Sequence, residues 1–204
     1  MPLLRIIRGR ADAPPEVKDK IRYLADPLKN VWQDESFVGL PGRLKGYMLP
    51  DDFDCDAIFY AFMAPHWAYG DVRSGHRLFY HFLMDFGGLL SPEQAVELGW
   101  QIAMWFQRFD VQYLQGLHCV KSIGNSVTGP VFQPHVHWMV STRMLDGSGK
   151  KLHIGKPELK AMKTYANRVL AAHRLPLIVM KGNNTNECKI GGSGDLSCDS
   201  DKRS

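Results

Sequence analysis

Cysteine is scarce in this chain of 204 residues, and the spacing of its cysteines excludes two common kinds of small scaffold. The four cysteines are scattered and form no C-x-x-C pair. Such spacing fits neither a zinc ribbon nor a framework of disulfide bonds, so we expect reduced thiols. They are Cys55, Cys119, Cys188 and Cys198.

Long apolar runs are also absent. No stretch approaches the roughly 20 apolar residues that a membrane-spanning helix needs. The first ten residues, MPLLRIIRGR, lack the apolar stretch and the small-residue cleavage site of a signal peptide. These observations predict a protein that has no membrane span and stays in the cytoplasm.

No internal repeat is visible, and the composition is that of one globular domain. Apolar residues make up 45% of the chain and aromatic residues 11%, which suffices for a single core at this length. Residues 181–204 contain almost nothing that could be buried, as is typical of a flexible polar tail. We therefore predict one domain over residues 1–180, followed by a tail over residues 181–204.

The net charge of +4 is small, but the charges are unevenly distributed. Residues 141–181 contain nine Lys and Arg residues against two acidic residues. On a folded surface this segment would form a basic face suited to phosphate groups. An ordinary solvated helix face would have the same composition, and the sequence leaves both interpretations open.

Strand and helix signals alternate along the predicted domain. The clearest helix start is SPEQ, with Ser91 as the N-cap and Pro92 at the first helical position. Residues 30–50, rich in glycine and proline, read as an irregular loop. We expect strands at 3–7, 76–86, 111–120 and 135–144, and helices that begin near residues 14, 55, 92 and 157. This order predicts an α+β fold: a two-layer single domain in which helices cover an antiparallel sheet.

Two histidines separated by one valine, His135 and His137, begin the last predicted strand. Alternate side chains of a strand face the same way, so both imidazoles project from one face and can converge on one cation. His118, near the end of the preceding predicted strand, could supply a third nitrogen. Three neutral imidazoles would leave coordination positions open, as in catalytic metal sites. A hydrogen-bonded pair of core histidines is the alternative.

Three further inferences concern side-chain direction. In the predicted helix, Tyr23 points about 120° away from the apolar stripe of Val17, Ile21 and Leu24, at about 100° per residue. His81 and Asp85 share one face of the strand at 76–86, and one of them could orient a metal-bound imidazole. The remaining histidines are expected on the surface; they are His66, His76, His153 and His173.

The order of these features resembles the relaxase, or mobilization nuclease, domain of the MobA/MobL type, within the His-hydrophobic-His class of endonucleases. The resemblance covers most of residues 3–175. A first strand leads to a helix with a tyrosine in IRYLADPLKN, and YHFLMDFGGLLSPEQAVELGWQIA follows. A strand ending in a histidine, the paired histidines and a basic helix after DGSGKKLHIGKPELK complete the match.

The resemblance implies a metal-dependent enzyme that nicks one DNA strand at an origin of transfer. By that resemblance, His118, His135 and His137 would hold Mg²⁺ or Mn²⁺, and Tyr23 would attack the scissile phosphate to give a 5′-phosphotyrosine. The partners would be single-stranded DNA and accessory relaxosome proteins. The DNA backbone could contact basic residues of the last third of the chain, namely Arg143, Lys150, Lys151, Lys156, Lys160 and Lys163.

The sequence departs from the family pattern at one position near the metal. Family members commonly carry an aspartate two residues after the first histidine, where this chain has Val120. Three other functions therefore remain open. They are a non-catalytic relative that binds single-stranded DNA, a rolling-circle replication initiator, and an unrelated three-histidine metallohydrolase in which water is the nucleophile.

Overall fold

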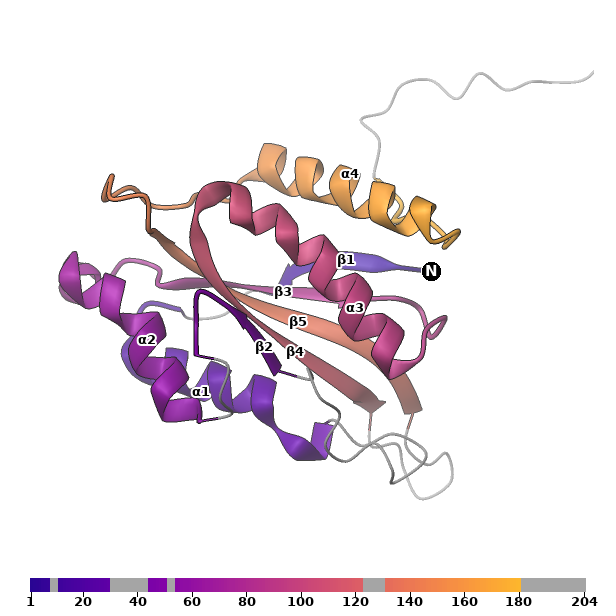
Figure 1. Ribbon diagram of the computed structural model, residues 1–204, viewed down its shortest axis with the longest axis horizontal. Coiled ribbons are helices and arrows are strands. Elements are labelled where there is room, and N and C mark those ends of the chain that lie inside the picture. The colour runs from indigo at the N-terminus through magenta and orange to yellow at the C-terminus, as the bar shows by residue number, and fades with distance from the viewer. Residues whose placement is uncertain (8–10, 30–43, 51–53, 123–130, 181–204) are drawn as a thin grey trace, which may run out of the picture.

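The computed structural model describes residues 1–7, 11–29, 44–50, 54–122 and 131–180. Its centre is a five-stranded sheet in which every neighbouring pair is antiparallel. Across the sheet the order is β1 (Leu3–Ile7), β3 (Phe79–Asp85), β5 (Val131–Met144), β4 (Val111–Ser122) and β2 (Leu44–Tyr47) (Figure 1). The predicted α+β class and antiparallel sheet are confirmed.

Strand β2 lies in a segment that we expected to be an irregular loop. It has four residues, and only Leu44 among them is buried. A strand this short shows no alternation of apolar and polar residues, which explains why the sequence does not reveal it. Strand β5 begins at Val131, four residues before the predicted start, and contains Pro134. The predicted tail over residues 181–204 lies outside the described residues.

Within the described ranges, four α-helices cover the sheet, with short 3-10 helices between them. Helices α1 (Pro14–Ala25) and α2 (Cys55–Ala68) pack on one face, and α3 (Pro92–Ala103) and α4 (Lys156–Ala172) on the other (Figure 1). The 3-10 helices are η1 (Pro27–Lys29), η3 (Asp71–Ser74) and η4 (Met104–Phe109). None of the helices in the described ranges is both long and apolar enough to cross a bilayer.

The sheet is the middle of three layers, where the sequence led us to expect two. Trp138 belongs to the core under α3 and α4, whereas its neighbour Met139 belongs to the core under α1 and α2. Both residues are fully buried, because consecutive side chains of a strand point to opposite faces and both faces are covered. The chain therefore has two hydrophobic cores, one on each face of the sheet.

Helix α3 begins as the sequence predicted. Ser91 Oγ accepts a hydrogen bond from the backbone N–H of Gln94 at 3.3 Å, and Gln94 Oε1 accepts one from the backbone N–H of Ser91 at 3.0 Å. This reciprocal pair satisfies donors that the first turn of a helix leaves without partners. Ala95, Leu98 and Ile102 then bury the face of the helix that lies on the sheet.

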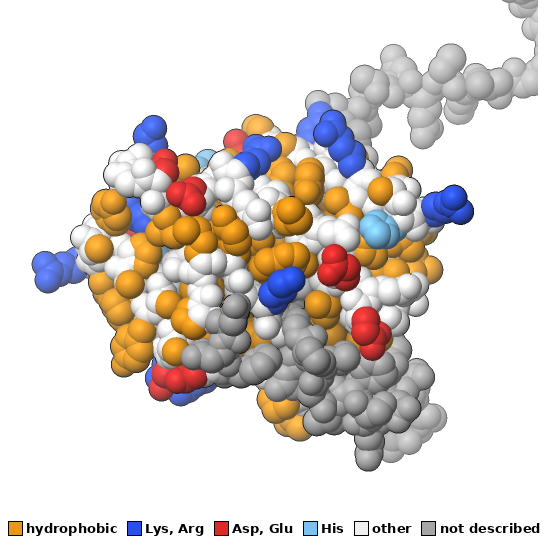
Figure 2. All heavy atoms as spheres, viewed as in Figure 1, with side chains coloured by type: hydrophobic (Ala, Val, Ile, Leu, Met, Phe, Trp, Pro, Cys, Tyr) orange, Lys and Arg blue, Asp and Glu red, His pale blue; other side chains and the backbone are white. Residues whose placement is uncertain are grey.

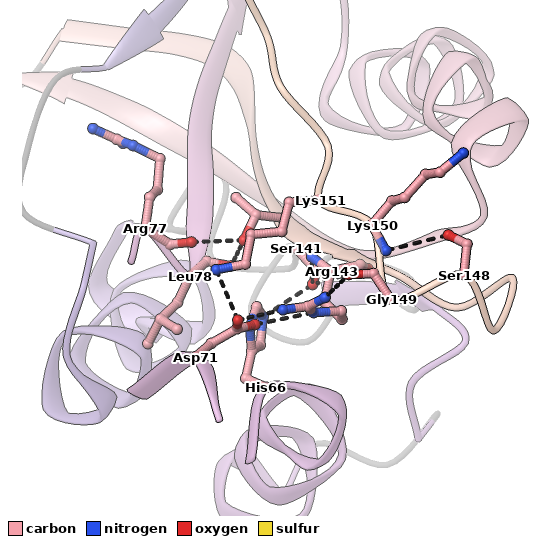
Figure 3. A network of polar contacts seen from close by, with 11 residues as sticks. His66, Asp71, Arg77, Leu78, Ser141, Arg143, Ser148, Gly149, Lys150 and Lys151 are labelled. Atoms are coloured by element: carbon pink, nitrogen blue, oxygen red, sulfur yellow. Dashed lines mark hydrogen bonds and ion pairs between the residues drawn. The ribbon is translucent and has the colours of Figure 1, made fainter. Parts of the chain in front are cut away.

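A buried polar cluster fixes the end of α2 to strand β5 (Figure 3). His66 Nδ1 lies 2.8 Å from Asp71 Oδ2, and His66 Nε2 lies 3.1 Å from Ser141 Oγ. The guanidinium of Arg143 donates to both carboxylate oxygens of Asp71, and Lys151 Nζ lies 2.7 Å from Oδ1. His66 is fully buried in this cluster, so its expected surface position was wrong.

The carboxylate of Asp71 is the negative charge that His66, Arg143 and Lys151 all contact in this cluster. Burial by itself would raise the pKa of Asp71, but hydrogen bonds from Arg143, Lys151 and His66 outweigh it and lower the pKa to about 2. Asp71 is therefore ionised at neutral pH and neutralises the buried guanidinium of Arg143. Breaking such a buried pair leaves one charge without compensation.

We predict that Asp71→Asn lowers the free energy of unfolding by about 3–5 kcal/mol, because Arg143 would remain charged and buried without its counter-ion. Urea unfolding followed by circular dichroism measures this change. The matched control is Asp146→Asn, since Asp146 is exposed and its carboxylate bonds to Ser148. Equal stabilities for the two variants would contradict a structural role for the cluster.

Candidate metal centre and nucleophile

Three strands present histidines on the face of the sheet that α1 partly covers. His118 of β4 lies opposite His135 of β5, and His137 lies opposite Gly116. One ring nitrogen from each of His118, His135 and His137 can be chosen such that all three lie within 4.8 Å of one another. The structure thus brings together the three histidines that the sequence analysis selected as ligands.

Hydrogen bonds to carbonyl oxygens set which nitrogen of two of these rings carries the proton. His118 Nε2 lies 3.0 Å from the carbonyl oxygen of Tyr23, and His135 Nδ1 lies 2.7 Å from that of Gln133. A carbonyl oxygen only accepts, so each of these nitrogens must donate. The lone pair that could bind a cation is then on Nδ1 of His118 and on Nε2 of His135.

The third imidazole is oriented by a fourth histidine. His137 Nδ1 lies 2.8 Å from His81 Nε2. The other nitrogen, His137 Nε2, is buried and has no hydrogen-bond partner among the described residues. A buried polar atom left without a partner costs about 1–3 kcal/mol, and a cation bound at Nε2 would remove that cost. The tautomer of His137 that donates Nδ1–H to His81 Nε2 has its lone pair on Nε2, and one nitrogen from each of the three imidazoles then fits a divalent metal ion.

Burial keeps these histidines neutral, which is the protonation state that a metal ligand requires. Burial, followed by the charge of His135, lowers the pKa of His118 to about 3. Burial, followed by the charge of Lys20, lowers the pKa of His81 to about 3. The pKa of His137 is also lowered by burial and by its histidine neighbours.

Asp85 is connected to the candidate ligand His135 through Gln133. Its carboxylate accepts from the side-chain amide of Gln133 and from the backbone N–H of Gly87. The carbonyl of Gln133 in turn accepts from His135. We expected that one of His81 and Asp85 could orient a ligand. His81 contacts an imidazole ring directly, and Asp85 holds Gln133, whose carbonyl contacts another.

Tyr23 lies against the histidine cluster. The centroid of its ring is 4.8 Å from that of His118, 5.4 Å from that of His137 and 5.9 Å from that of His81, each in an edge-on arrangement. The side chain is partly buried, and burial followed by the charge of Asp26 raises the pKa of its hydroxyl. Tyr23 thus belongs to the same site as the histidines, as the sequence analysis required of a nucleophile.

A glycine in β4 allows α1 to approach closely enough for this contact. A Cβ atom built on Gly116 would lie 2.7 Å from the carbonyl oxygen of Leu24, a distance that real Cβ atoms do not reach. Glycine removes that collision. The last turn of α1 can then lie directly on the strand, with the carbonyl of Tyr23 within reach of His118.

Two lysines flank the tyrosine ring, and the sequence analysis did not identify them. Lys29 Nζ lies 3.6 Å and Lys20 Nζ 4.4 Å from the ring centroid of Tyr23. Lys20 stands three residues before Tyr23 on one helix, a spacing that brings side chains together and could have revealed it. Lys29 is placed by the 3-10 helix after Pro27, for which the sequence offers no comparable pattern.

The expected DNA-contacting residues fall into two groups. Arg143 is only 3% exposed and is bound to Asp71, which Lys151 also contacts, so these two residues do not present their charges to a DNA backbone. That expectation was wrong for both, because the buried carboxylate at position 71 requires their charge. Lys150, Lys156 and Lys160 are exposed and Lys163 is partly exposed. The last three lie on α4, on the opposite face of the sheet from the histidines.

We predict that the protein binds one Mn²⁺ ion and that His137→Ala weakens this binding by more than 100-fold. Loss of an orienting residue alone costs about 10–100-fold, so His81→Ala should fall in that range and loss of a ligand beyond it. Isothermal titration calorimetry measures both, with exposed His153→Ala as the control. Unchanged affinity in His137→Ala would exclude the site.

The lowered histidine pKa values also predict how stability depends on pH in metal-free protein. The unfolded chain takes up protons on these histidines below about pH 6.5, whereas the folded protein leaves His81 and His118 neutral down to about pH 3. Stability should therefore fall as the pH is lowered from 7 to 4. Thermal unfolding in EDTA should show a shallower fall for His81→Gln than for the native protein. If stability falls equally with pH in His81→Gln and in exposed His153→Gln, burial of neutral His81 does not contribute to the pH dependence.

No family model and no curated protein matches the chain. One similar solved structure is described under the molecular basis of vancomycin resistance transfer in Staphylococcus aureus. It has 13% sequence identity and a TM-score of 0.53, and the match covers 90% of this chain and 99% of that chain. Others are Mn-bound MobM relaxase domains in complex with plasmid pMV158 oriT DNA. One, with 22-nucleotide DNA carrying a 3′-thiophosphate, has 13% identity and a TM-score of 0.53, with 91% and 94% of the two chains covered.

A second MobM complex has 14% identity and a TM-score of 0.52, with 92% of this chain and 96% of that chain covered. At these identities the likeness is one of fold. It extends over nine-tenths or more of both chains. The resemblance drawn from the order of sequence motifs is thus confirmed at that level: the chain has the fold of relaxase domains.

Proposed function

We propose that the protein is a DNA relaxase that nicks one strand at an origin of transfer and becomes joined to the DNA through Tyr23. The observation that carries this proposal is the packing of the Tyr23 ring against His118 and His137, beside an uncompensated histidine nitrogen. Support comes from the shared fold with MobM relaxase domains that were solved with oriT DNA and Mn. We expect the reaction to take place in the cytoplasm.

In the proposed reaction, Tyr23 Oη attacks the phosphorus atom of the scissile phosphodiester. A bond forms between Oη and phosphorus, and the bond between phosphorus and the 3′ oxygen breaks. The hydroxyl of Tyr23 loses its proton, and the departing 3′ oxygen gains one. The product is a 5′-phosphotyrosine and a free 3′ hydroxyl, so attack by a 3′ hydroxyl on the phosphotyrosine rejoins the strand by the reverse path.

The residues of the site have separate roles in this step. His118, His135 and His137 would hold the metal ion, which when bound polarises the phosphate oxygens. Three nitrogen ligands favour Mn²⁺ over Mg²⁺, because Mg²⁺ strongly prefers oxygen. Lys20 and Lys29 bring positive charge to both the tyrosine ring and the incoming phosphate. Burial, followed by the charge of Asp26, raises the pKa of Tyr23, so the attacking hydroxyl is protonated at neutral pH and must lose its proton during the reaction.

The remaining exposed lysines would hold the DNA backbone. Lys150, Lys156 and Lys160 are exposed and Lys163 is partly exposed, and Lys and Arg side chains gather along the upper margin of the view in Figure 2, over α4. Contacts of this kind strengthen binding without reading sequence. Accessory relaxosome proteins would then be needed to help select the origin.

We predict that Tyr23→Phe abolishes both nicking and covalent attachment while Mn²⁺ binding persists, because the variant loses only the attacking oxygen. The protein is incubated with single-stranded DNA from its own mobile element and Mn²⁺, and adducts are resolved on a denaturing gel. Mapping the modified peptide should place the DNA on Tyr23, and EDTA should prevent the reaction. Tyr60→Phe is the matched control, since Tyr60 is 60% exposed on α2 and should retain activity.

The other candidate functions give different results in the same experiment. Hydrolysis that continues in Tyr23→Phe would indicate water as the nucleophile, as in an unrelated metallohydrolase. DNA binding with neither adduct nor nicking in the native protein would indicate a non-catalytic relative. An adduct formed on a replication origin, but not on an origin of transfer, would indicate a rolling-circle initiator. Each of these outcomes would overturn the proposal.

A further inference from the structure

A basic groove runs between the outer edge of β1 and the first turns of α4. Its volume is about 600 Å³. None of its lining residues is acidic, and apart from Gly155 the uncharged ones are apolar. Its basic residues come from two elements, β1 and α4, and from two connections; they are Arg5, Arg77, His153, Lys156 and Lys163. We call this feature the β1–α4 groove.

One wall of the β1–α4 groove is a strand edge. In the part of the chain that the structure describes, β1 pairs with β3 and has no strand on its other side. The backbone N–H groups along that outer edge are therefore available to an acceptor in the groove. Backbone donors and five basic side chains together make the groove selective for an anionic chain.

The chemistry of the walls favours phosphates over bases or peptides. The apolar lining is almost entirely aliphatic, and its single aromatic residue, Tyr80, is buried and accepts a hydrogen bond from the backbone N–H of Ile154. Sites that stack nucleotide bases use exposed aromatic rings. The volume is that of a small-ligand site, which admits part of one extended strand and no duplex.

The β1–α4 groove lies at the edge of the sheet that also carries the candidate metal centre. Ile7 of β1 is the register partner of His81 in β3, and Arg5 is the partner of Leu83, which in turn lies opposite His137. Directly opposed residues in antiparallel strands point to the same face, so Arg5 and Ile7 lie on the histidine face. Leu4 and Ile6 lie on the α4 face and also line the groove. The lining of the groove thus includes residues from both faces of the sheet edge, and Arg5 and Ile7 share a face with the histidines.

We propose that the β1–α4 groove binds the phosphate backbone of single-stranded DNA next to the segment that occupies the metal centre, with the bases turned outward. The proposal rests on the proposed function for the identity of the anionic chain. It gives the lysines of α4 a role although they lie behind the sheet: the strand reaches Lys156 and Lys163 by passing over β1. Binding in this groove is independent of sequence.

The test compares two double variants that each remove two positive charges. Lys156→Gln with Lys163→Gln removes charge from the groove, and Arg73→Gln with Arg168→Gln removes it from exposed positions elsewhere, the second also on α4. Binding of fluorescent oligothymidine is measured by anisotropy in EDTA, across a range of salt concentrations. Because no metal is present, the result does not depend on nicking.

The groove variant should reduce the slope of log K against log salt concentration by about 1.4, since each neutralised phosphate of a single strand contributes about 0.7. Over one decade of salt this difference in slope equals a factor of about 25, so the loss of affinity of the groove variant relative to the native protein should be about 25-fold larger at 0.1 M than at 1 M salt. The control variant should bind as the native protein does. If the native protein does not nick DNA but the two double variants bind as expected, the proposed function is refuted and the groove assignment stands.

Three results would overturn the groove assignment even if nicking is observed. Equal losses in the two double variants would show a general effect of net charge. An equal loss of affinity for duplex DNA would show that the lysines do not act on a single strand in a groove. Tighter binding of oligoglutamate than of oligothymidine, abolished in the groove variant, would identify an acidic peptide as the occupant.

Discussion

Antiparallel pairing between β4 and β5 determines the geometry on which the site depends. The register places His118 opposite His135 and Gly116 opposite His137. A slip of one residue would turn every side chain of β5 to the other face and send His137 into the core under α3 and α4. The three imidazoles therefore converge only as long as this one register holds.

The core on the other face of the sheet holds that register. Trp138 and Gln115 are register partners, and Trp138 Nε1 donates to Gln115 Oε1 at 2.7 Å. The amide nitrogen of Gln115 donates to the carbonyl of Val96 in α3 at 3.0 Å. Both side chains are fully buried, so a slip would leave their polar groups without partners. Packing of the core under α3 and α4 thus positions the histidines on the opposite face of the sheet.

Sequence reasoning succeeded where one local pattern determines the outcome. The capping signature at Ser91 predicted the start of α3, and the alternation of His135 and His137 predicted their common face. It failed where the position of a side chain depends on a charged residue far away in the sequence. Arg143 lies in a basic segment, and only the fold shows that Asp71, 72 positions earlier, draws it into the interior. Lys29 likewise reaches Tyr23 through a turn that carries no periodic signal.

The Asp71 cluster and the cluster of His81, His118, His135 and His137 differ in a way that separates structure from function. In the Asp71 cluster the carboxylate is met by Arg143 and Lys151, so burial of charge is offset by pairing. Buried Lys151 Nζ is paired with Asp71 at 2.7 Å, whereas His137 Nε2 of the histidine cluster has neither a hydrogen bond nor an ion pair among the described residues. A cluster whose only role is stability gains nothing from such an atom, because its desolvation is not compensated. A cluster that must capture a cation requires it, since a nitrogen already bonded within the protein has no lone pair to give.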